Sequence, residues 1–364
     1  MQLPLSRPPQ NICLLRLSAI GDVTHAVALV RSIQRQWPDT RITWVIGELE
    51  AQLVGDIPGV EFVVFDKGRG FRAFMDLRRA MRGRRFDVLL HMQVALRANL
   101  AAALIPADIR LGYDRTRSRD LHGAFITHRI PSIHGQHVLE LFHTFGETLG
   151  LQSEPPRWEI PVDPADESFA RQWIPDDTPT LLISPCSSHS LRNWRPENYA
   201  IVADHAIRRH GLRVILCGGP GKLEREYGDN ILQHMLETPV DLIGRDSLKR
   251  MLAMLKRASV LIAPDSGPMH MATATGTPVI GLHAASNPRR SGPWHSLRWC
   301  VDKYDQAARV FKGQPAAELR WGTKLEYPGV MDLIRPEEVC ERLDEFMRER
   351  GGPAAPPQHP QADR

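Results

Sequence analysis

Two short segments, one near each end of the chain, hold residues that could bind and activate a ligand. The first reads Arg16-Leu-Ser-Ala-Ile-Gly-Asp22-Val-Thr-His25, and the second reads Ala263-Pro-Asp265-Ser-Gly-Pro-Met-His270-Met-Ala272. Each contains small residues, a carboxylate and a histidine, and each follows a short apolar run and leads into a helical pattern. Such a strand-to-helix turn presents free backbone N–H groups and the positive end of a helix dipole, so both segments suit an anionic ligand.

The carboxylate of the first segment has two interpretations. Aspartate is among the preferred N-cap residues, so Asp22 could serve only to begin a helix. A carboxylate that faces a ligand can instead accept a proton from an attacking hydroxyl group, which is the role of a general base. Gly21, immediately before it, lets the backbone approach a ligand closely. The local sequence leaves both roles open.

The second segment is also open to two interpretations. Asp265 and Ser266 can cap the helix that follows, with Gly267 as part of an ordinary turn. Alternatively, the backbone N–H groups of Ser266 and Gly267 hold a diphosphate at the start of that helix. His270 lies one turn into the helix, where it either contacts a phosphate or packs.

A third loop, between residues 184 and 194, adds groups that suit phosphate oxygens. It carries the hydroxyls of Ser187 and Ser188 and the guanidinium of Arg192. The glycine-rich stretch 218–222 lacks the spacing and the Ser/Thr of a Walker A loop, so we exclude a P-loop ATPase. No Gly-x-Gly-x-x-Gly follows the first strand, which disfavours a nicotinamide-dependent enzyme.

These loops require strands before them and helices after them. Apolar runs typical of parallel strands lie at 11–17, 41–46, 60–64, 86–91, 180–184, 212–217, 240–242, 260–263 and 278–282. Helical patterns alternate with them, which favours βαβ units. The Pro-rich and acidic stretch 152–180 is interpreted as a linker. We therefore expect an α/β protein of two Rossmann-like parallel-sheet domains that face each other across a cleft.

The domain bounds follow from this pattern: residues 1–165 and 166–350, with a disordered tail over 351–364. A chain of 364 residues is long for one core. No apolar run is long enough to span a membrane, and the N-terminus lacks a signal-peptide core, so a cytoplasmic protein is expected. The five scattered cysteines fit reduced thiols, and no histidine group has the spacing of a metal site, so neither a metal nor a cofactor is expected.

Charge is unevenly distributed along the chain. Residues 67–130 contain 14 Lys and Arg against 5 Asp and Glu, although the whole chain has a net charge of only +4. Arg115, Arg117 and Arg119 form the densest cluster and could hold phosphates of a large acceptor. Few aromatic residues lie among them, so a nucleic-acid partner is not expected.

Together, these blocks resemble the ADP-heptose lipopolysaccharide heptosyltransferase family, a group of GT-B glycosyltransferases. The first block resembles the family's Lys-x-Ser-x-x-Gly-Asp-Val/Ile pattern, with Arg16 in place of the common lysine. The loop before Trp194 resembles its phosphate loop, and Asp265–Ala272 resembles its Asp-Ser/Thr-Gly-x-x-His-x-Ala pattern. The resemblance implies a GT-B fold and inverting transfer of heptose from ADP-heptose to the inner core of lipopolysaccharide.

The resemblance also implies a role for each matching residue. Asp22 corresponds to the proposed catalytic base. Donor contacts are implied for Ser187, Ser188, Arg192, Glu224, Asp265, Ser266, Gly267 and His270. Acceptor contacts are implied for Arg16, Ser18, Gly21, His25, Arg115, Arg117 and Arg119. Because the acceptor is a lipid, peripheral contact with the cytoplasmic face of the inner membrane is also expected.

Two other functions remain open at this stage. A GT-B transferase could use a different nucleotide sugar, and trials of several donors would separate the two enzymes. A non-catalytic protein that binds a nucleotide sugar or an anionic glycolipid could share the same loops, and detection of turnover would exclude it.

Overall fold

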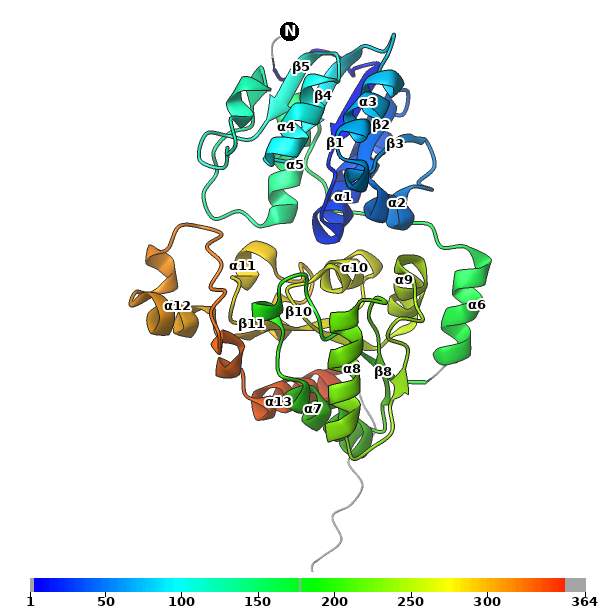
Figure 1. Ribbon diagram of the computed structural model, residues 1–364, viewed down its shortest axis with the longest axis vertical. Helices are drawn as coiled ribbons and strands as arrows, with labels where there is room; N and C mark the ends of the chain where they lie inside the picture. The colour runs from blue at the N-terminus through cyan, green and yellow to red at the C-terminus, as the bar shows by residue number, and fades with distance from the viewer. Residues whose placement is uncertain (1–2, 177, 351–364) are drawn as a thin grey trace, which may run out of the picture. The chain divides into compact units, whose positions relative to one another are not determined.

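The computed structural model describes residues 3–176 and 178–350 of the chain (Figure 1). Of these, residues 3–163 form one compact unit and residues 164–350 form a second, apart from 289–291, which group with the first. The sequence pattern placed the boundary at 165/166. The expected disordered tail, 351–364, lies outside the described residues.

The first unit is a six-stranded parallel sheet in the order β3-β2-β1-β4-β5-β6. Its strands are β1 (Asn11–Leu15), β2 (Arg41–Gly47), β3 (Val60–Phe65), β4 (Phe86–His91), β5 (Ala107–Gly112) and β6 (His128–Arg129). Its helices are α1 (Ile20–Gln36), α2 (Glu48–Val54), α3 (Phe71–Ala80), α4 (Leu96–Ala103) and α5 (Val138–Leu149).

The second unit repeats this topology, in the order β12-β11-β10-β7-β8-β9. Its strands are β7 (Thr180–Ile183), β8 (Arg213–Leu216), β9 (Val240–Asp241), β10 (Val260–Pro264), β11 (Val279–His283) and β12 (Val301–Asp302). The helices after residue 163 are α6 (Pro164–Trp173), α7 (Pro196–His210), α8 (Lys222–His234), α9 (Leu248–Arg257), α10 (Gly267–Thr275), α11 (Pro288–Ser291), α12 (Tyr304–Lys312) and α13 (Pro336–Glu349). Counted from its own first strand, each sheet has the Rossmann order 3-2-1-4-5-6.

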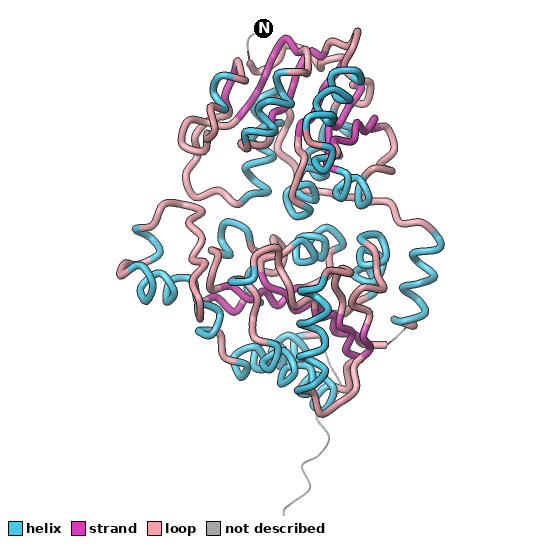
Figure 2. The backbone as a smooth tube through the Cα atoms, viewed as in Figure 1, coloured by secondary structure: helices cyan, strands magenta, loops and turns pink. Residues whose placement is uncertain are grey.

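Helices cover both faces of each sheet, so the central strands are buried on both sides (Figure 2). In the first unit, Cys13 and Leu15 of β1 pack with Leu77 of α3 and Ala98 of α4. Because side chains alternate across a strand, the neighbouring residues of β1 enter the opposite layer. This explains why the strands appear in the sequence as unbroken apolar runs.

The same arrangement holds the second unit together. Leu181 and Ile183 of β7 share a core with Tyr199 of α7 and with Leu343 and Phe346 of α13. The prediction of an α/β fold with two Rossmann-like parallel sheets is confirmed. None of the described helices is long and apolar enough to cross a membrane.

The stretch 152–180, interpreted from its sequence as a linker, contains a helix, and that interpretation is wrong for 164–173. Helix α6 begins with Pro164 and has Asp166 and Glu167 in its first turn, which are ordinary helix-start signals. It packs on α9, where the Arg250 guanidinium lies 4.6 Å from the centre of the Phe169 ring. Proline and acidic residues mark a helix start as readily as a linker, so composition alone did not distinguish the two.

Candidate active site

The loop that carries Asp22 lies at the point where the strand order of the first sheet reverses. β1 pairs with β2 on one side and with β4 on the other, and all these strands are parallel. The loops after β1 and β4 therefore leave the same sheet edge in opposite directions and open a crevice between them. In open α/β sheets, ligands bind at this position.

Asp22 occupies the first turn of α1 and is not its N-cap. The N-cap is Ala19, and no side chain caps this end of the helix. The structural interpretation of Asp22 as an N-cap is therefore wrong. Its carboxylate instead accepts a hydrogen bond from the Arg16 guanidinium, and its side chain remains 34% exposed. The carboxylate is thus fixed in direction and still reachable from outside.

Arg16 is enclosed on several sides. Its guanidinium also donates to the backbone oxygen of Met92, after β4, and lies 5.4 Å from the centre of the Phe142 ring. Its side chain is only 11% exposed. Both terminal nitrogens of Arg16 thus donate to groups of the protein itself, and the acceptor contact expected for this residue stays a prediction. The residue holds Asp22 in place.

A glutamine after β4 completes the crevice. Gln93 Oε1 accepts from the backbone N–H of Leu17 at 2.8 Å, and its Nε2 donates to Ser18 Oγ at 3.2 Å. The buried Tyr113 hydroxyl donates to the Met92 oxygen at 3.0 Å. These bonds join the loops after β1, β4 and β5. Neither Gln93 nor Tyr113 was among the predicted site residues, since no local pattern marks them.

His25, expected to contact the acceptor, lies inside the unit. It is 1% exposed, and its ring meets those of His137 and Phe142 edge-on, with centroids 5.7 and 6.5 Å away. Gly21, also on α1, is buried as well. A direct acceptor contact by the His25 side chain therefore does not fit the structure. The ring packs behind the turn that carries Asp22.

The three arginines after β5 differ in exposure. Arg115 and Arg119 are exposed, whereas Arg117 is partly buried and pairs with Asp114. Arg117 also donates to the backbone oxygen of Ile133. Burial would raise the pKa of Asp114, but hydrogen bonds from Thr116 and Arg117 outweigh it and keep that pKa below its ordinary value. Arg117 thus organises the loop, and the acceptor contact expected for it does not fit.

A buried pair of histidines supports the same loops. Asn99 Oδ1 lies 2.8 Å from His91 Nε2 and 3.0 Å from His122 Nδ1, and His122 Nε2 accepts the backbone N–H of Tyr113 at 3.1 Å. Burial lowers the pKa of His91 to about 3 and that of His122 to about 4. Both rings are therefore neutral near pH 7, and His122 carries its proton on Nδ1.

In the second unit, the predicted donor loops lie at the corresponding position. β7 pairs with β8 and β10, so its sheet reverses between β7 and β10. The loop 184–195 follows β7, and Asp265-Ser266 follows β10 and leads into α10. Both loops therefore meet at one crevice, as the two loops of the first unit do.

The start of α10 has an unsatisfied hydroxyl. Ser266 is the N-cap, but its side chain makes no capping hydrogen bond. Its Oγ is buried and has no hydrogen-bond partner among the described residues. A buried hydroxyl without a partner is costly in a protein interior. Together with the N–H groups at the start of α10, it forms a site prepared for an anion.

Asp265 is held as an anion by Lys324 and His270. The Lys324 ammonium donates to its Oδ2, and His270 Nε2 lies 3.7 Å from its Oδ1. Burial alone would raise the pKa of Asp265, but His270 and Lys324 hold it well below its usual range. His283, completely buried close by, has its pKa lowered to about 4, mainly by burial.

The phosphate loop after β7 is tied to the segment around residue 325. Arg192 Nε donates to Glu326 Oε1 at 2.7 Å, and His189 Nε2 lies 3.6 Å from Glu326 Oε2. Ser187 Oγ donates to the His189 backbone oxygen at 2.9 Å, whereas Ser188 is exposed. The Ser187 hydroxyl is thus engaged within the loop, and Arg192 is 21% exposed.

Glu224 lies in the first turn of α8, directly over the glycine-rich loop after β8. A Cβ atom at Gly221 would come within 2.3 Å of Glu224 Oε2, so the Glu224 carboxylate lies directly against this glycine. Burial, with a contribution from the Glu224 charge, raises the pKa of Asp246, after β9, to about 7. Two carboxyl groups therefore share this end of the crevice of the second unit.

Several residues of these clusters escaped prediction. Lys324 and Glu326 lie 59 and 134 residues from their partners Asp265 and Arg192. No periodicity or motif connects positions so far apart. Lys324 and Glu326 lie on either side of the apolar Leu325, and so short a pattern is a weak signal of a binding site.

Comparison with known proteins adds to this geometry. A model of glycosyltransferase family 9 (heptosyltransferase) matches residues 74–318. The chain is 38% identical over 342 residues to the lipopolysaccharide core heptosyltransferase OpsX of Haemophilus influenzae. The alignment covers 94% of this chain and 98% of that protein. These matches run through both units.

Solved structures give a similar result for the fold. The glycosyl transferase family 9 protein of Veillonella parvula aligns with a TM-score of 0.76 at 21% identity, covering 93% of this chain and 97% of that one. The ADP-heptose lipopolysaccharide heptosyltransferase II of Escherichia coli aligns with a TM-score of 0.70 at 19% identity, covering 94% and 100%. At these identities, the likeness concerns the fold alone.

Proposed function

This chain belongs to glycosyltransferase family 9, the heptosyltransferases, and we propose that it transfers a heptose from ADP-heptose to the inner core of lipopolysaccharide. The observation that carries the proposal is the 38% identity to OpsX along 94% of the chain. OpsX is a lipopolysaccharide core heptosyltransferase, and the matched stretch contains both crevices described above.

The second unit takes the donor. The start of α10, with the Ser266 hydroxyl, receives the diphosphate, because N–H groups and a helix dipole stabilise negative charge. Lys324 and Arg192 supply positive charge near it, each already paired with a carboxylate. Glu224, beside the glycine loop, is the group for the ribose end, where its oxygens can accept hydrogen bonds from hydroxyls.

The first unit supplies the base. Asp22 accepts the proton of an acceptor hydroxyl while the hydroxyl oxygen attacks the anomeric carbon of the heptose. The bond from that carbon to the diphosphate oxygen breaks, ADP leaves with the electron pair, and the configuration inverts. Arg16 orients the carboxylate, and groups that bind the leaving diphosphate more strongly as its charge grows lower the barrier.

Acceptor binding uses the basic surface of the first unit. Arg115 and Arg119, both exposed after β5, are the arginines of that cluster available for phosphate groups of a core oligosaccharide. Arg117, with its pairing to Asp114, keeps their loop in shape. Guanidinium groups suit phosphates because their N–H donors match two oxygens at once.

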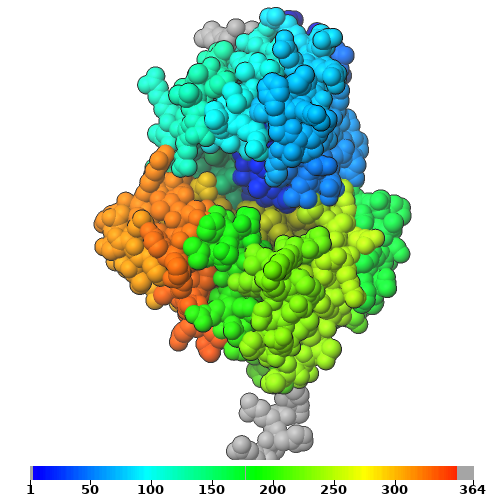
Figure 3. Space-filling model, in the orientation of Figure 1, coloured from blue at the N-terminus to red at the C-terminus, as the bar shows by residue number. Residues whose placement is uncertain are grey.

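The first unit has a surface that suits contact with the membrane that carries the acceptor. Helix α3 buries Ala73 and Leu77 against the sheet and leaves Phe71 77% and Met75 52% exposed. The segment 67–85 holds eight Lys and Arg and one acidic residue. This surface, drawn in light blue in Figure 3, combines exposed apolar groups with positive charge. Such a combination fits an anionic lipid surface, and we assign it peripheral contact with the cytoplasmic face of the inner membrane.

The test is direct transfer. Purified protein is incubated with ADP-heptose and with lipopolysaccharide acceptors whose cores end at defined sugars, and the products are read by mass spectrometry. One acceptor is expected to gain the mass of a single heptose. Transfer from another nucleotide sugar, but not from ADP-heptose, would establish the alternative GT-B transferase. Binding without turnover for every donor and acceptor would overturn the proposal.

A further inference from the structure

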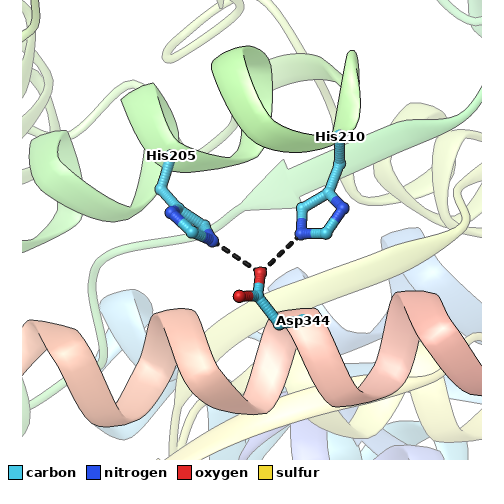
Figure 4. Close-up of side chains that lie close together, drawn as sticks. All are labelled: His205, His210 and Asp344. Carbon is cyan, nitrogen blue, oxygen red and sulfur yellow. Dashed lines mark hydrogen bonds and ion pairs between the residues drawn. The ribbon is translucent and has the colours of Figure 1, made fainter. Parts of the chain in front are cut away.

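A cluster of metal-ligating side chains lies in the second unit, away from the crevice of that unit. His205 and His210 of α7 point toward α13, and Asp344 of α13 points back between them (Figure 4). Asp344 Oδ1 lies 2.6 Å from Nε2 of each histidine. The three ligand atoms all lie within 4.8 Å of one another.

The spacing of these residues in the sequence does not predict the cluster. His205 and His210 are five residues apart, a spacing that places two side chains on different faces of a regular helix. His210, however, is the last residue of α7, and Gly211 after it turns the chain in a left-handed conformation at φ 64°. Asp344 comes from a helix more than a hundred residues later. Only the packing of α13 on α7 brings the three together.

The surroundings favour a cation. The side chains of His205, His210 and Asp344 are 26%, 11% and 30% exposed, so an ion and its water can reach them. Residues 337–349 of α13 contain six acidic residues against Arg342 and Arg348, and three of the six, Glu338, Glu345 and Glu349, are paired with Lys303, Arg342 and Arg298.

The ligand set selects the ion. Two imidazole nitrogens and one carboxylate oxygen suit zinc and its neighbours among the transition metals, whereas Mg²⁺ and Ca²⁺ prefer oxygen alone. On a tetrahedral zinc ion with bonds of about 2.0–2.2 Å, ligand atoms lie about 3.3 Å apart. Small side-chain rotations would bring the present 2.6 Å separations to that value.

We propose that His205, His210 and Asp344 bind one divalent transition-metal ion of the zinc class, with water completing its coordination. The role is structural. Helix α7 starts beside the donor loop and runs for 15 residues, about 22 Å, so its end lies far from that crevice. The ion would fasten α13, the last described helix, to α7 and would add to the apolar contacts that already join them.

The test uses untagged, full-length protein treated with a chelator and then titrated with Zn²⁺ against a chromophoric competitor. One equivalent is expected to bind, and Mg²⁺ is not expected to compete. At a hundredfold excess over the dissociation constant, bound Zn²⁺ should raise the thermal midpoint of the second unit by roughly 5–10 °C. Absence of a stoichiometric site in the wild-type protein would overturn the proposal.

The variant Asp344→Asn distinguishes a cluster that binds a metal ion from one that is held only by hydrogen bonds. The amide oxygen can still accept from the histidines but is a poor zinc ligand, so Zn²⁺ affinity should fall at least about 10–100-fold. Glu341→Gln, one turn earlier on the same helix, removes the same charge and should bind Zn²⁺ like the wild type. His205→Asn provides a second variant should Asp344→Asn fail to fold.

Equal Zn²⁺ affinity in wild type, Asp344→Asn and Glu341→Gln would show that the ion binds elsewhere and would refute the site. Heptose transfer by Asp344→Asn should equal that of the wild type, because the cluster lies at the end of α7 that is far from the donor loop. The inference and the proposed reaction therefore fail independently of each other.

Discussion

At the scale of single residues, the first crevice is built around one carboxylate. Asp22 is oriented by Arg16, which is itself fixed by the Met92 oxygen and the Phe142 ring. A base must keep one geometry while its partner hydroxyl approaches, since small misplacements are costly in rate. In the proposed mechanism the partly buried arginine provides that rigidity, and Asp22, 34% exposed, is the group that the acceptor hydroxyl approaches.

Asp22→Asn tests this role. The amide keeps the shape and can still accept a hydrogen bond from Arg16, but it cannot take up a proton. Turnover should fall about 10²–10⁴-fold, while the affinity for ADP-heptose stays within about twofold of wild type. Turnover is measured by mass spectrometry and affinity by calorimetry. The control is Asp39→Asn, at an exposed position of the same unit. Turnover within tenfold of wild type would remove Asp22 from the mechanism.

Ser266 offers a second test at this scale. Because its buried hydroxyl lacks a partner among the described residues, Ser266→Ala should leave the thermal midpoint unchanged or raise it slightly. The same change should weaken ADP binding about tenfold, by loss of one hydrogen bond to a charged group. Ser187→Ala, which removes an internal bond to the His189 oxygen, is the contrast and should lower stability instead. A Ser266→Ala variant that loses stability but binds ADP normally would make this hydroxyl structural.

At the scale of elements, the same strand order occurs twice with different loops. In both sheets the functional loops follow the first and fourth strands of the unit, where parallel strands diverge. In the first unit these loops carry the Asp22 carboxylate. In the second unit they carry the start of α10 and the Ser266 hydroxyl, which has no hydrogen-bond partner among the described residues. The fold thus supplies the position, and the loop residues supply the chemistry.

Helix α3 gives a prediction at this scale. Phe71→Ser with Met75→Ser should weaken binding to vesicles that contain phosphatidylglycerol by roughly tenfold, because two exposed apolar side chains no longer insert. Added salt should weaken binding of the wild type, since its arginines act through charge. Cosedimentation with vesicles measures both effects.

The control for α3 lies in the second unit. Leu236 and Val310 are 75% and 60% exposed, and their replacement by serine removes apolar surface of similar kind. That double variant should bind vesicles like the wild type. Equal losses in both double variants, or equal binding of wild type to neutral and anionic vesicles, would exclude α3 as the membrane contact.

At the scale of the whole molecule, buried neutral histidines set the response to pH. The pKa values of His91, His122 and His283 lie at about 3, 4 and 4, against an ordinary 6.5. As the pH falls below 6.5, the unfolded chain binds protons that the folded chain does not. Each histidine therefore lowers the unfolding free energy by up to about 1.4 kcal/mol per pH unit until its own folded pKa is reached.

The free energy of unfolding should accordingly decrease between about pH 6.5 and pH 4, as measured by denaturant titration. Asp246, with its pKa raised to about 7, and Glu50, whose pKa burial also raises, oppose this change, whereas His143 and His295, whose pKa values burial lowers, add to it. His283→Asn should reduce the slope of the unfolding free energy against pH by the equivalent of up to one proton. His234→Asn, at an exposed position on α8, should leave that slope unchanged. A free energy that is constant over this range would contradict the neutral state of these histidines.

The sequence alone predicted nine of the described strands and several helices, because their signals come from residues two to four positions apart. The apolar run 11–17 became β1, and the periodic pattern after Asp22 became α1. The linker interpretation failed at α6, where Pro164 and two acids begin a helix whose partner α9 lies far along the chain. The strands β5, β6 and β12 were not predicted: Asp108 and Arg110 interrupt the apolar pattern of β5, and β6 and β12 span only two residues each.

The sequence predicted the loops of the candidate site. It did not predict which side chains of the protein contact one another there. The patterns and the family resemblance predicted roles for Asp22, Ser266 and Asp265, which stay predictions. The resemblance also implied acceptor contacts for Arg16, His25 and Arg117, whose side chains contact Asp22, lie in the interior and pair with Asp114, respectively. Side-chain partners depend on which strands become neighbours, and no local rule specifies that.

The sequence by itself determined the kind of chemistry and the strand-to-helix turns that hold it, since motif composition and backbone preference are local properties. Tertiary structure decided which of those groups remain available. It paired Lys324 with Asp265, left the Ser266 hydroxyl unsatisfied, and gathered His205, His210 and Asp344 at the end of α7. These outcomes arise from contacts between residues far apart in the chain, which exist only after the sheets and their covering helices have packed.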